Sequence, residues 1–337
     1  MSALSETPFF IVGHPRSGTT LLRFLLGSHP RLYIPEETGF IPFLVKRRQL
    51  DAELSLAQAQ RVVARIGRLN HLWRDMVTDL PAFYAALPRP TLAFVLDDLY
   101  RRQIAAHGAV RWGDKTPLYV RYIPTIERIF ADAQFIHVIR DGRDAALSAL
   151  HKWPERRTYM DLYYLLKQWV NNVEAGRAAG QRLGDARYIE VRYEELVQQP
   201  LAALERVADF LGERFHPAML DHTQLAREVG PGPQGHTEVQ RPISTGSVGR
   251  WRSQMTPFER KMAERIAGET LAALGYERPA PGSLNAAERA ALLLRGARYW
   301  LTNALRSTLY ASGILTLNRG MRQGNEGTRK KGNKETG

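Results

Sequence analysis

A short segment near the N-terminus restricts the fold more than any other feature of the sequence. The apolar run Phe9–Val12 is typical of a buried parallel strand, and Thr19–Gly27 has the pattern of a helix. Between them lies the loop Gly-His-Pro-Arg-Ser-Gly, residues 13–18. In such a strand–loop–helix unit the backbone N–H groups converge, and the start of the helix adds partial positive charge. The sequence therefore predicts a phosphate-binding loop in an α/β protein.

The loop departs from the nucleotide-binding loop of P-loop kinases in its cation. The spacing of Gly13 and Gly18 matches that loop, but Thr19 stands where the P-loop has its lysine, and Arg16 lies inside the loop instead. The apolar run 135–139 ends in Arg140 and not in an aspartate that could hold magnesium. We therefore expect a site built from cationic side chains, with no metal. A P-loop small-molecule kinase is the alternative.

Strand patterns and helix patterns alternate along most of the chain. Residues 135–139 and 188–191 resemble two further buried strands. The alternation predicts an α/β fold with a P-loop-type parallel sheet and helices on both faces. Asp51 and Thr91 are the expected N-caps of the second and third helices, and 228–249 is expected to be a long loop. The expected later helices are 51–69, 91–107, 117–130, 142–152, 159–183, 201–211, 257–274 and 286–317.

The composition excludes several classes of protein. The chain has 337 residues, of which 44% are apolar, and this suffices for a packed core. It has no cysteine, which excludes disulfides, thiolate catalysis and cysteine-bound zinc. Residues 1–8 lack the pattern of a secretory signal, and three arginines interrupt the apolar stretch 290–317, so we expect a cytoplasmic protein. The net charge of +13 indicates an anionic partner, and without a nucleic-acid recognition motif we expect a nucleotide and no nucleic acid.

Several sequence blocks, found in a fixed order, carry a family resemblance. Together they resemble the sulfotransferases, with the closest pattern in the tyrosylprotein sulfotransferases and their bacterial relatives. Members of that family transfer a sulfuryl group from 3′-phosphoadenosine 5′-phosphosulfate (PAPS) to an acceptor hydroxyl. The resemblance covers roughly residues 8–276. The blocks are Pro15–Leu21, Ser28–Pro30, Glu36–Thr38, Asp114–Pro117, Arg140–Arg143 with Ser148, Tyr193–Leu196 and Gly249–Trp251.

The resemblance implies which residues bind the donor, because each aligns with a family position. PAPS has two separated anionic ends, so two cationic pockets are needed, and the ends of two neighbouring strands can supply them. The implied contacts to the 5′-phosphosulfate are Arg16, Ser17, Gly18, Thr19 and Thr20. The implied contacts to the 3′-phosphate and the rest of the nucleotide are Arg140, Ser148, Lys152, Tyr193 and Arg250.

The same resemblance implies the catalytic groups. Glu37 matches the base that takes the proton of the acceptor hydroxyl. Lys115 and Arg16 would stabilise the negative charge that grows on the bridging oxygen during in-line transfer. His14 is the rival base, because it lies inside the phosphate loop. Relatives have a serine where Gly235 stands, so the contribution of the stretch from Gly235 to Pro242 is left open.

The chain divides into three expected parts. Residues 1–282 would form the sulfotransferase domain, with 46–110 as a helical insert that acts as an acceptor lid. Residues 283–318 would form an amphipathic helix, and 319–337 a basic disordered tail. The acceptor is left open among a tyrosine, a saccharide, a lipid and a small alcohol.

The C-terminal helix has a defined apolar face. We expect this face to dock on the sheet domain. A homodimer through the helix and a peripheral contact with an anionic membrane are the alternatives. The residues of the face are Leu293, Leu294, Trp300, Leu301, Ala304 and Leu305.

Overall fold

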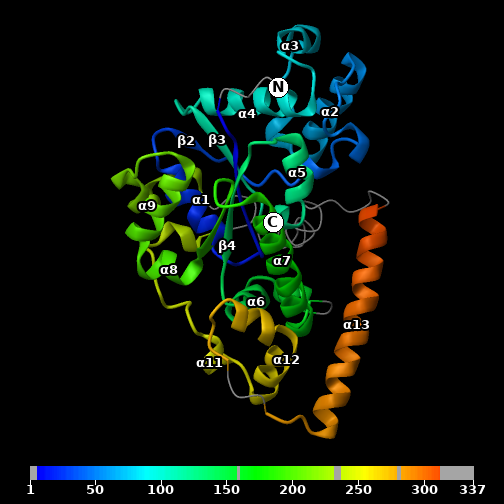
Figure 1. Ribbon diagram of the computed structural model, residues 1–337, viewed down its shortest axis with the longest axis vertical. Helices are drawn as coiled ribbons and strands as arrows, with labels where there is room; N and C mark the ends of the chain where they lie inside the picture. Colours follow the sequence, from blue (N-terminus) through cyan, green and yellow to red (C-terminus); the bar gives the residue numbers. More distant parts are fainter. Residues whose placement is uncertain (1–5, 158–159, 231–236, 279–281, 312–337) are drawn as a thin grey trace, which may run out of the picture.

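A sheet of five parallel strands forms the centre of the computed structural model, which describes residues 6–157, 160–230, 237–278 and 282–311. The strand order is β2-β3-β1-β4-β5, and every neighbouring pair is parallel (Figure 1). The predicted parallel α/β fold is therefore confirmed. The strands are β1 (Phe9–Gly13), β2 (Leu32–Tyr33), β3 (Arg111–Lys115), β4 (Gln134–Ile139) and β5 (Tyr188–Arg192).

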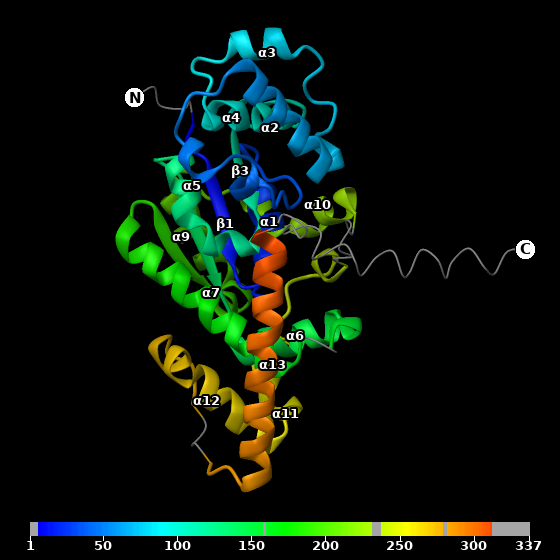
Figure 2. The ribbon, with the colours of Figure 1, turned by 90° about the vertical axis from the view of Figure 1, so that its right-hand side faces the viewer.

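Helices surround the sheet and extend beyond both of its ends (Figures 1 and 2). The α-helices are α1 (Thr19–Gly27), α2 (Leu56–Leu69), α3 (Leu80–Ala86), α4 (Leu92–Ala105), α5 (Ile123–Ile129), α6 (Gly142–Lys152), α7 (Leu162–Leu183), α8 (Tyr193–Gln198), α9 (Pro200–Leu211), α10 (His222–Val229), α11 (Trp251–Gln254), α12 (Pro257–Ala273) and α13 (Ala286–Ala311). The 3₁₀ helices are η1 (Ile41–Phe43), η2 (Arg47–Gln49), η3 (His71–Trp73), η4 (Pro117–Arg121), η5 (Pro154–Arg156), η6 (Pro217–Leu220) and η7 (Glu238–Gln240).

The central strand β1 shows why the sheet is covered on both faces. Successive side chains of a strand point to opposite faces. Phe10 and Val12 belong to a core with residues of α4 and α5, whereas Phe9 and Ile11 belong to a second core with residues of α1 and α9. All four side chains are fully buried. The unbroken apolar run thus serves two cores at once, as is usual for strands of parallel sheets.

The sequence patterns missed two of the five strands. β1, β4 and β5 occur where apolar runs predicted them, but β2 has only two residues, and β3 carries Arg111, Asp114 and Lys115. All five residues of β3 are buried. Its charged groups find partners inside the protein, as when Arg111 Nε donates to the carbonyl of Thr7 at 2.6 Å. A strand of this kind lacks the apolar run that sequence patterns detect.

Two predicted helices begin or end elsewhere. The expected helix 117–130 is divided into η4 and α5, with Pro124 in the first turn of α5. Proline has no N–H for the bond to the preceding turn, so the helix restarts there. α2 begins after Ser55 and not at Asp51, because Ser55 and Gln58 form a capping box. Asp51 pairs with Arg128 at 3.0 Å instead.

The C-terminal helix docks by a different face from the predicted one. α13 contacts α7 through Tyr299, which is 5% exposed. Leu293, Leu294 and Leu301 of the predicted face are 64–75% exposed and point away from the protein. The expected end of the helix at 317 and the tail 319–337 lie outside the described residues. No helix in the described ranges combines the length and the apolar character that a membrane span requires.

The packing of α7 on the sheet generates a test of the fold. A Cβ atom on Gly176 would lie 2.4 Å from Cε1 of His137 on β4 and 2.8 Å from Cγ2 of Val120. Overpacking of this kind costs about 1–3 kcal/mol. We therefore expect Gly176→Ala to lower the free energy of unfolding, measured by denaturant titration, by that amount. The control is Ala178→Ser, which also adds one heavy atom to α7 but at an exposed position. It should change the free energy of unfolding by less than about 0.5 kcal/mol. Equal stabilities of the two variants would contradict the close packing.

Candidate active site

The loop between β1 and α1 has the backbone shape of an anion-binding loop. Gly18 and Arg16 adopt left-handed conformations, with φ angles of 95° and 70°. The turn is closed by the N–H of Ser17, which donates to the carbonyl of His14 at 3.2 Å. A Cβ on Gly18 would lie 2.4 Å from Cδ2 of Tyr193, so only glycine lets the loop approach this ring. The first N–H groups of α1 have no partner within the helix and are available to an anion.

Two arginines from the ends of β1 and β4 meet at this loop. Arg140 Nη1 donates to the backbone carbonyl of Arg16 at 3.1 Å, and Arg140 Nη2 donates to the carbonyl of Ser247 at 2.6 Å. The Arg140 guanidinium also lies 4.4 Å from the centre of the Tyr193 ring. Arg16 Nε donates to Oγ of Ser148 at 3.2 Å. The structure thus brings together four residues that the sequence assigned to the two ends of one nucleotide.

Burial and the neighbouring cations both disfavour the positive charges of this cluster. Burial lowers the pKa of Arg16, Glu238 opposes this, and the neighbouring Arg140 and Arg250 lower it further. Burial also lowers the pKa of Arg140, with Arg250 again contributing in the same direction. Arginine remains protonated in proteins despite such shifts. Three cations therefore lie close together in a poorly solvated place, which favours binding of an anion there.

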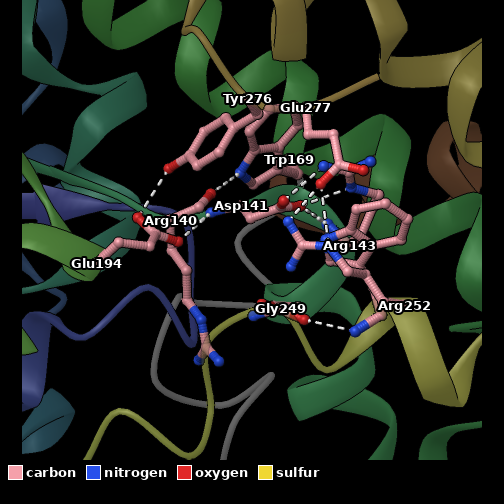
Figure 3. Close-up of polar contacts among 11 residues, drawn as sticks. Arg140, Asp141, Arg143, Trp169, Glu194, Gly249, Arg252, Tyr276 and Glu277 are labelled. Atoms are coloured by element: carbon pink, nitrogen blue, oxygen red, sulfur yellow. Dashed lines mark hydrogen bonds and ion pairs between the residues drawn. The ribbon is translucent and has the colours of Figure 1, made fainter. Parts of the chain in front are cut away.

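The loop after β4 is held by contacts behind the cluster (Figure 3). The N–H of Asp141 donates to Glu194 at 3.0 Å, and Nε1 of Trp169 donates to the carbonyl of Arg140 at 2.9 Å. Arg143 does not face the cavity. It pairs with Asp141 at 2.7 Å and stacks on the Trp251 ring. Arg143 therefore supports the loop, while Arg140 extends toward Arg16.

A second carboxylate fixes the segment that carries Arg250. Asp144, at the start of α6, accepts from the N–H of Gly249 at 2.6 Å and from the N–H of Trp251 at 2.9 Å. These bonds hold the residues on both sides of Arg250, whose side chain lines the cavity described below. Arg252, further along, points elsewhere and pairs with Glu277 (Figure 3).

Glu37 and Lys115 form a buried ion pair beside the phosphate loop. Lys115 Nζ contacts Glu37 Oε1, and their side chains are only 2% and 8% exposed. Lys115 Nζ also donates to Oγ1 of Thr20 at 3.3 Å, which joins the pair to the first turn of α1. Burial lowers the pKa of Lys115, and the Glu37 carboxylate opposes this shift. A carboxylate, an ammonium group and the phosphate loop thus share one small region.

A buried hydrogen-bond network positions this ion pair. The hydroxyl of Thr38 donates to the carboxylate of Asp114 at 2.6 Å. Thr38 is adjacent to Glu37 in the chain, and Asp114 is adjacent to Lys115. Asp114 also accepts from the hydroxyl of Tyr100, and the Thr38 hydroxyl bonds the Tyr119 hydroxyl at 2.8 Å. Burial raises the pKa of Asp114, and the hydrogen bonds from Thr38 and Tyr100 oppose this shift. The network fixes the segment of Glu37 on the strand of Lys115.

The rival base, His14, is engaged in structural contacts. Its Nδ1 lies 2.8 Å from Nδ2 of Asn172, and the Asn172 amide donates this bond because its oxygen already accepts from Arg121. Burial and the Arg121 guanidinium lower the pKa of His14 to about 3. A histidine with so low a pKa and an occupied acceptor nitrogen is a poor proton acceptor. This geometry favours Glu37 over His14 as the base.

A cavity of about 820 Å³ connects these groups. Its size lies within the range of small-molecule sites. Arg16, Glu37 and Arg140 lie on its polar side, and α13 contributes Asn303 to its wall. The apolar part of the wall consists of Leu118, Tyr122, Trp153, Met160, Leu165, Val239 and Ile243. The cavity therefore offers a polar end and an apolar end to its ligands.

Most of the residues singled out from the sequence meet at this cavity, but not all of them. The described residues singled out from the sequence that do not line it are Ser17, Lys115, Ser148 and Lys152. Lys115 and Ser148 lie behind the wall, where they contact Glu37 and Arg16. Arg156, four residues after Lys152, lines the cavity in its place. The basic stretch after α6 was the signal that could have indicated Arg156. Gly235 lies outside the described residues, while Glu238 and Ser247 of the same region contact Arg16 and Arg140. Within the described ranges, no group of three or more His, Asp and Glu residues is arranged to hold a metal ion.

Known proteins are similar to this chain in sequence. The model of the sulfotransferase family matches residues 8–217. Protein-tyrosine sulfotransferase 2 of Gallus gallus is 27% identical over 283 residues, which cover 80% of this chain and 69% of that protein. The protein-tyrosine sulfotransferase of Drosophila melanogaster is 24% identical over 282 residues, which cover 80% of this chain and 51% of that protein.

Solved structures share the fold. The sulfotransferase domain of the Synechococcus PCC 7002 olefin synthase superposes with a TM-score of 0.58 and 25% sequence identity, over 83% of this chain and 98% of that domain. The sulfotransferase domain from the curacin biosynthetic pathway also has a TM-score of 0.58, with 23% identity, over 82% of this chain and all of that domain. The match to the sulfotransferase family model favours a sulfotransferase over the kinase alternative. Because the family match covers more than half of the chain, this protein belongs to the sulfotransferase family and is an enzyme of that class.

Proposed function

We propose that this sulfotransferase transfers the sulfuryl group of PAPS to the hydroxyl of a tyrosine side chain in a protein or peptide. The observation that carries the proposal is the cavity lined by Arg16, Arg140 and Glu37. In it Arg140 contacts Arg16, and Glu37 pairs with the buried Lys115 behind the wall. Cations suit a donor that is anionic at both ends. The tyrosine acceptor rests on the relatives, which are protein-tyrosine sulfotransferases.

Buried donors at the site fit an anionic nucleotide. Ser17 Oγ, Arg140 Nε and Arg250 Nε are buried and have no hydrogen-bond partner within the described part of the chain. Buried donors without partners are costly, and phosphate oxygens accept several hydrogen bonds. All three belong to residues that the sequence assigned to the nucleotide. A bound phosphoadenosine group would satisfy such donors and offset the charge of Arg16, Arg140 and Arg250.

The chemistry is an in-line displacement at sulfur. The acceptor oxygen forms a bond to sulfur while the bond from sulfur to the bridging oxygen of the 5′-phosphate breaks. The products are the sulfated acceptor and adenosine 3′,5′-bisphosphate. Glu37 takes the hydroxyl proton as general base. Lys115 and Arg16 stabilise the charge that develops on the leaving oxygen, and the buried setting strengthens this interaction.

The apolar wall suits an aromatic acceptor. A phenol needs an apolar slot for its ring and a polar end for its hydroxyl. Tyr122 and Leu118 of the wall belong to the segment that follows Lys115, on the same cavity as Glu37. This arrangement supports placement of a tyrosine ring against η4, with its hydroxyl directed to the carboxylate.

Removal of the loop cation tests donor binding. A charge-assisted hydrogen bond contributes about 1.5–3 kcal/mol, so we expect Arg16→Ala to weaken binding of adenosine 3′,5′-bisphosphate about 10- to 100-fold. The measurement is isothermal titration without added magnesium. Arg61→Ala removes an exposed arginine of α2 and should leave the affinity unchanged. If both variants bind like the wild type, Arg16 does not hold the nucleotide.

Neutralisation of the proposed base tests the chemical step. Glu37→Gln keeps the shape but removes the proton acceptor, so we expect turnover to fall about 100- to 10,000-fold. Binding of adenosine 3′,5′-bisphosphate should persist. The assay follows radiolabelled sulfate from PAPS to a tyrosine-containing peptide. Glu36→Gln changes the adjacent carboxylate, which does not line the cavity, and serves as the matched control. Near-normal turnover by Glu37→Gln would remove Glu37 from this role.

The network behind the ion pair predicts a positioning effect. Thr38→Val removes the hydroxyl between Asp114 and Tyr119, so Glu37 loses its fixed position. We expect kcat to fall about 10- to 100-fold with little change in KM, measured below the unfolding temperature. Thr38→Ser restores the hydroxyl and should recover most of kcat. A folded Thr38→Val enzyme with normal kcat would show that the network serves stability alone.

A further inference from the structure

The C-terminal helix α13 has an inner face that docks on the protein and an opposite face that is exposed. Its inner face contacts α7 through the buried Tyr299, whose hydroxyl accepts from Gln168 at 3.2 Å and from Asn171 at 3.1 Å. Arg295 pairs with Asp161 at 3.0 Å on the same side. Both views show α13 as a long rod along the outside of the protein (Figures 1 and 2). The docking side thus combines the packing of Tyr299 and Leu292 against the core with polar contacts, and the opposite face is left uncovered.

The outer face is apolar and strongly exposed. Its large side chains recur with helical spacing, so they form one continuous stripe. By contrast, the large exposed apolar side chains Leu56, Leu201 and Leu220 are scattered over α2, α9 and η6. Scattered ones are normal, but a continuous stripe marks an interaction surface. The stripe consists of Leu293 (75% exposed), Leu294 (72%), Trp300 (70%), Leu301 (64%) and Leu305 (59%).

The charge around the stripe indicates its partner. Between Arg289 and Ala311 the sequence has four arginines and no acidic residue. Arg298, beside the stripe, pairs only at 3.5 Å with Asp161, and its side chain is 46% exposed. Residues 319–337 add six Lys or Arg against two Glu. Pairing two copies of this helix would bring like charges together, whereas an anionic lipid surface complements them.

We propose that the stripe of α13 docks the enzyme on an anionic membrane surface. The helix would lie in the plane of the interface, with its Leu and Trp side chains among the lipids and the exposed Arg289 and Arg298 at the headgroups. No described helix can span a membrane, so the contact is peripheral. Asn303 of the same helix lines the cavity, so the membrane contact and the reaction site share one element. The proposal does not depend on which acceptor is used.

Flotation of the full chain with vesicles tests the docking. We expect the wild type to float with vesicles of phosphatidylglycerol and phosphatidylcholine in equal parts, and much less with pure phosphatidylcholine. The triple variant Leu293→Gln, Leu294→Gln, Leu301→Gln should bind the anionic vesicles at least about tenfold more weakly, because each buried apolar side chain contributes to membrane binding. The matched control replaces Leu56, Leu201 and Leu220 by Gln and should float like the wild type.

Tryptophan fluorescence gives an independent readout of membrane contact, and it needs only one conservative substitution. The chain has six tryptophans, and Trp300 is 70% exposed, whereas Trp73, Trp112, Trp169 and Trp251 are buried. Anionic vesicles should shift the emission to shorter wavelength, and Trp300→Phe should abolish the shift. Sulfate transfer to a peptide in solution checks that each variant is folded.

Three outcomes would overturn the proposal. One is equal flotation with neutral and anionic vesicles. Another is flotation that the triple variant retains. The third is a dimer, detected by sedimentation without lipid, that the triple variant dissociates while neither protein floats, because the stripe would then bind a second copy of the chain.

Discussion

The hydrogen bond from Arg140 to the backbone carbonyl of Arg16 is the contact on which the site depends. It exists because β1 and β4 are parallel neighbours, with Gly13 paired to Val138, so that the loops after the two strands emerge side by side. A cation that donates to a carbonyl of the other cationic loop partly offsets the repulsion between the two side chains. The remaining repulsion and burial are what an anionic ligand relieves.

A second contact places the ion pair of Glu37 and Lys115 beside this binding site. Thr38 is adjacent to Glu37, and Asp114 is adjacent to Lys115. The hydrogen bond between Thr38 and Asp114 fixes the loop of Glu37 on strand β3. β3 is the neighbour of β1, so Lys115 reaches Thr20 at the start of α1. Lys115 on β3, the phosphate loop after β1 and the loop of Glu37, which Thr38 ties to β3, are therefore fixed on two adjacent strands, and this favours precise geometry.

The sequence predicted the parts of the fold that local patterns determine. β1, β4, β5, α1 and α6 were predicted with at most small errors at their ends, because apolar runs and helix periods report burial directly. β3 was missed because Arg111, Asp114 and Lys115 are buried with partners that are distant in sequence. Such pairing is decided by tertiary structure, and a pattern read along the chain cannot detect it.

The site was predicted in its loops and less well at its edges. Arg16 and Arg140 were located because each follows a predicted strand, whereas Glu37 was indicated by the family resemblance, and all three line the cavity. The resemblance indicated Lys152 where the cavity has Arg156, because the chain leaves α6 for η5 and the helical spacing no longer applies. The error at Lys152 therefore has the same cause as the missed strand β3. In both places the course of the chain is set by contacts with residues that are distant in the sequence.

The C-terminal helix shows the limit of periodicity most clearly. The pattern identified an amphipathic helix and its apolar face, but amphipathicity alone does not say which face meets the protein. In α13 the docking is decided by Tyr299 and Arg295, whose partners Gln168 and Asp161 lie far away in the sequence. With Tyr299 packed in the core and Arg295 paired on the same side, the large apolar residues on the opposite side of the helix face outward. A chain that keeps Leu294, Trp300 and Leu301 exposed on the helix that contributes Asn303 to its cavity has a continuous apolar surface of the kind that marks an interaction with a partner.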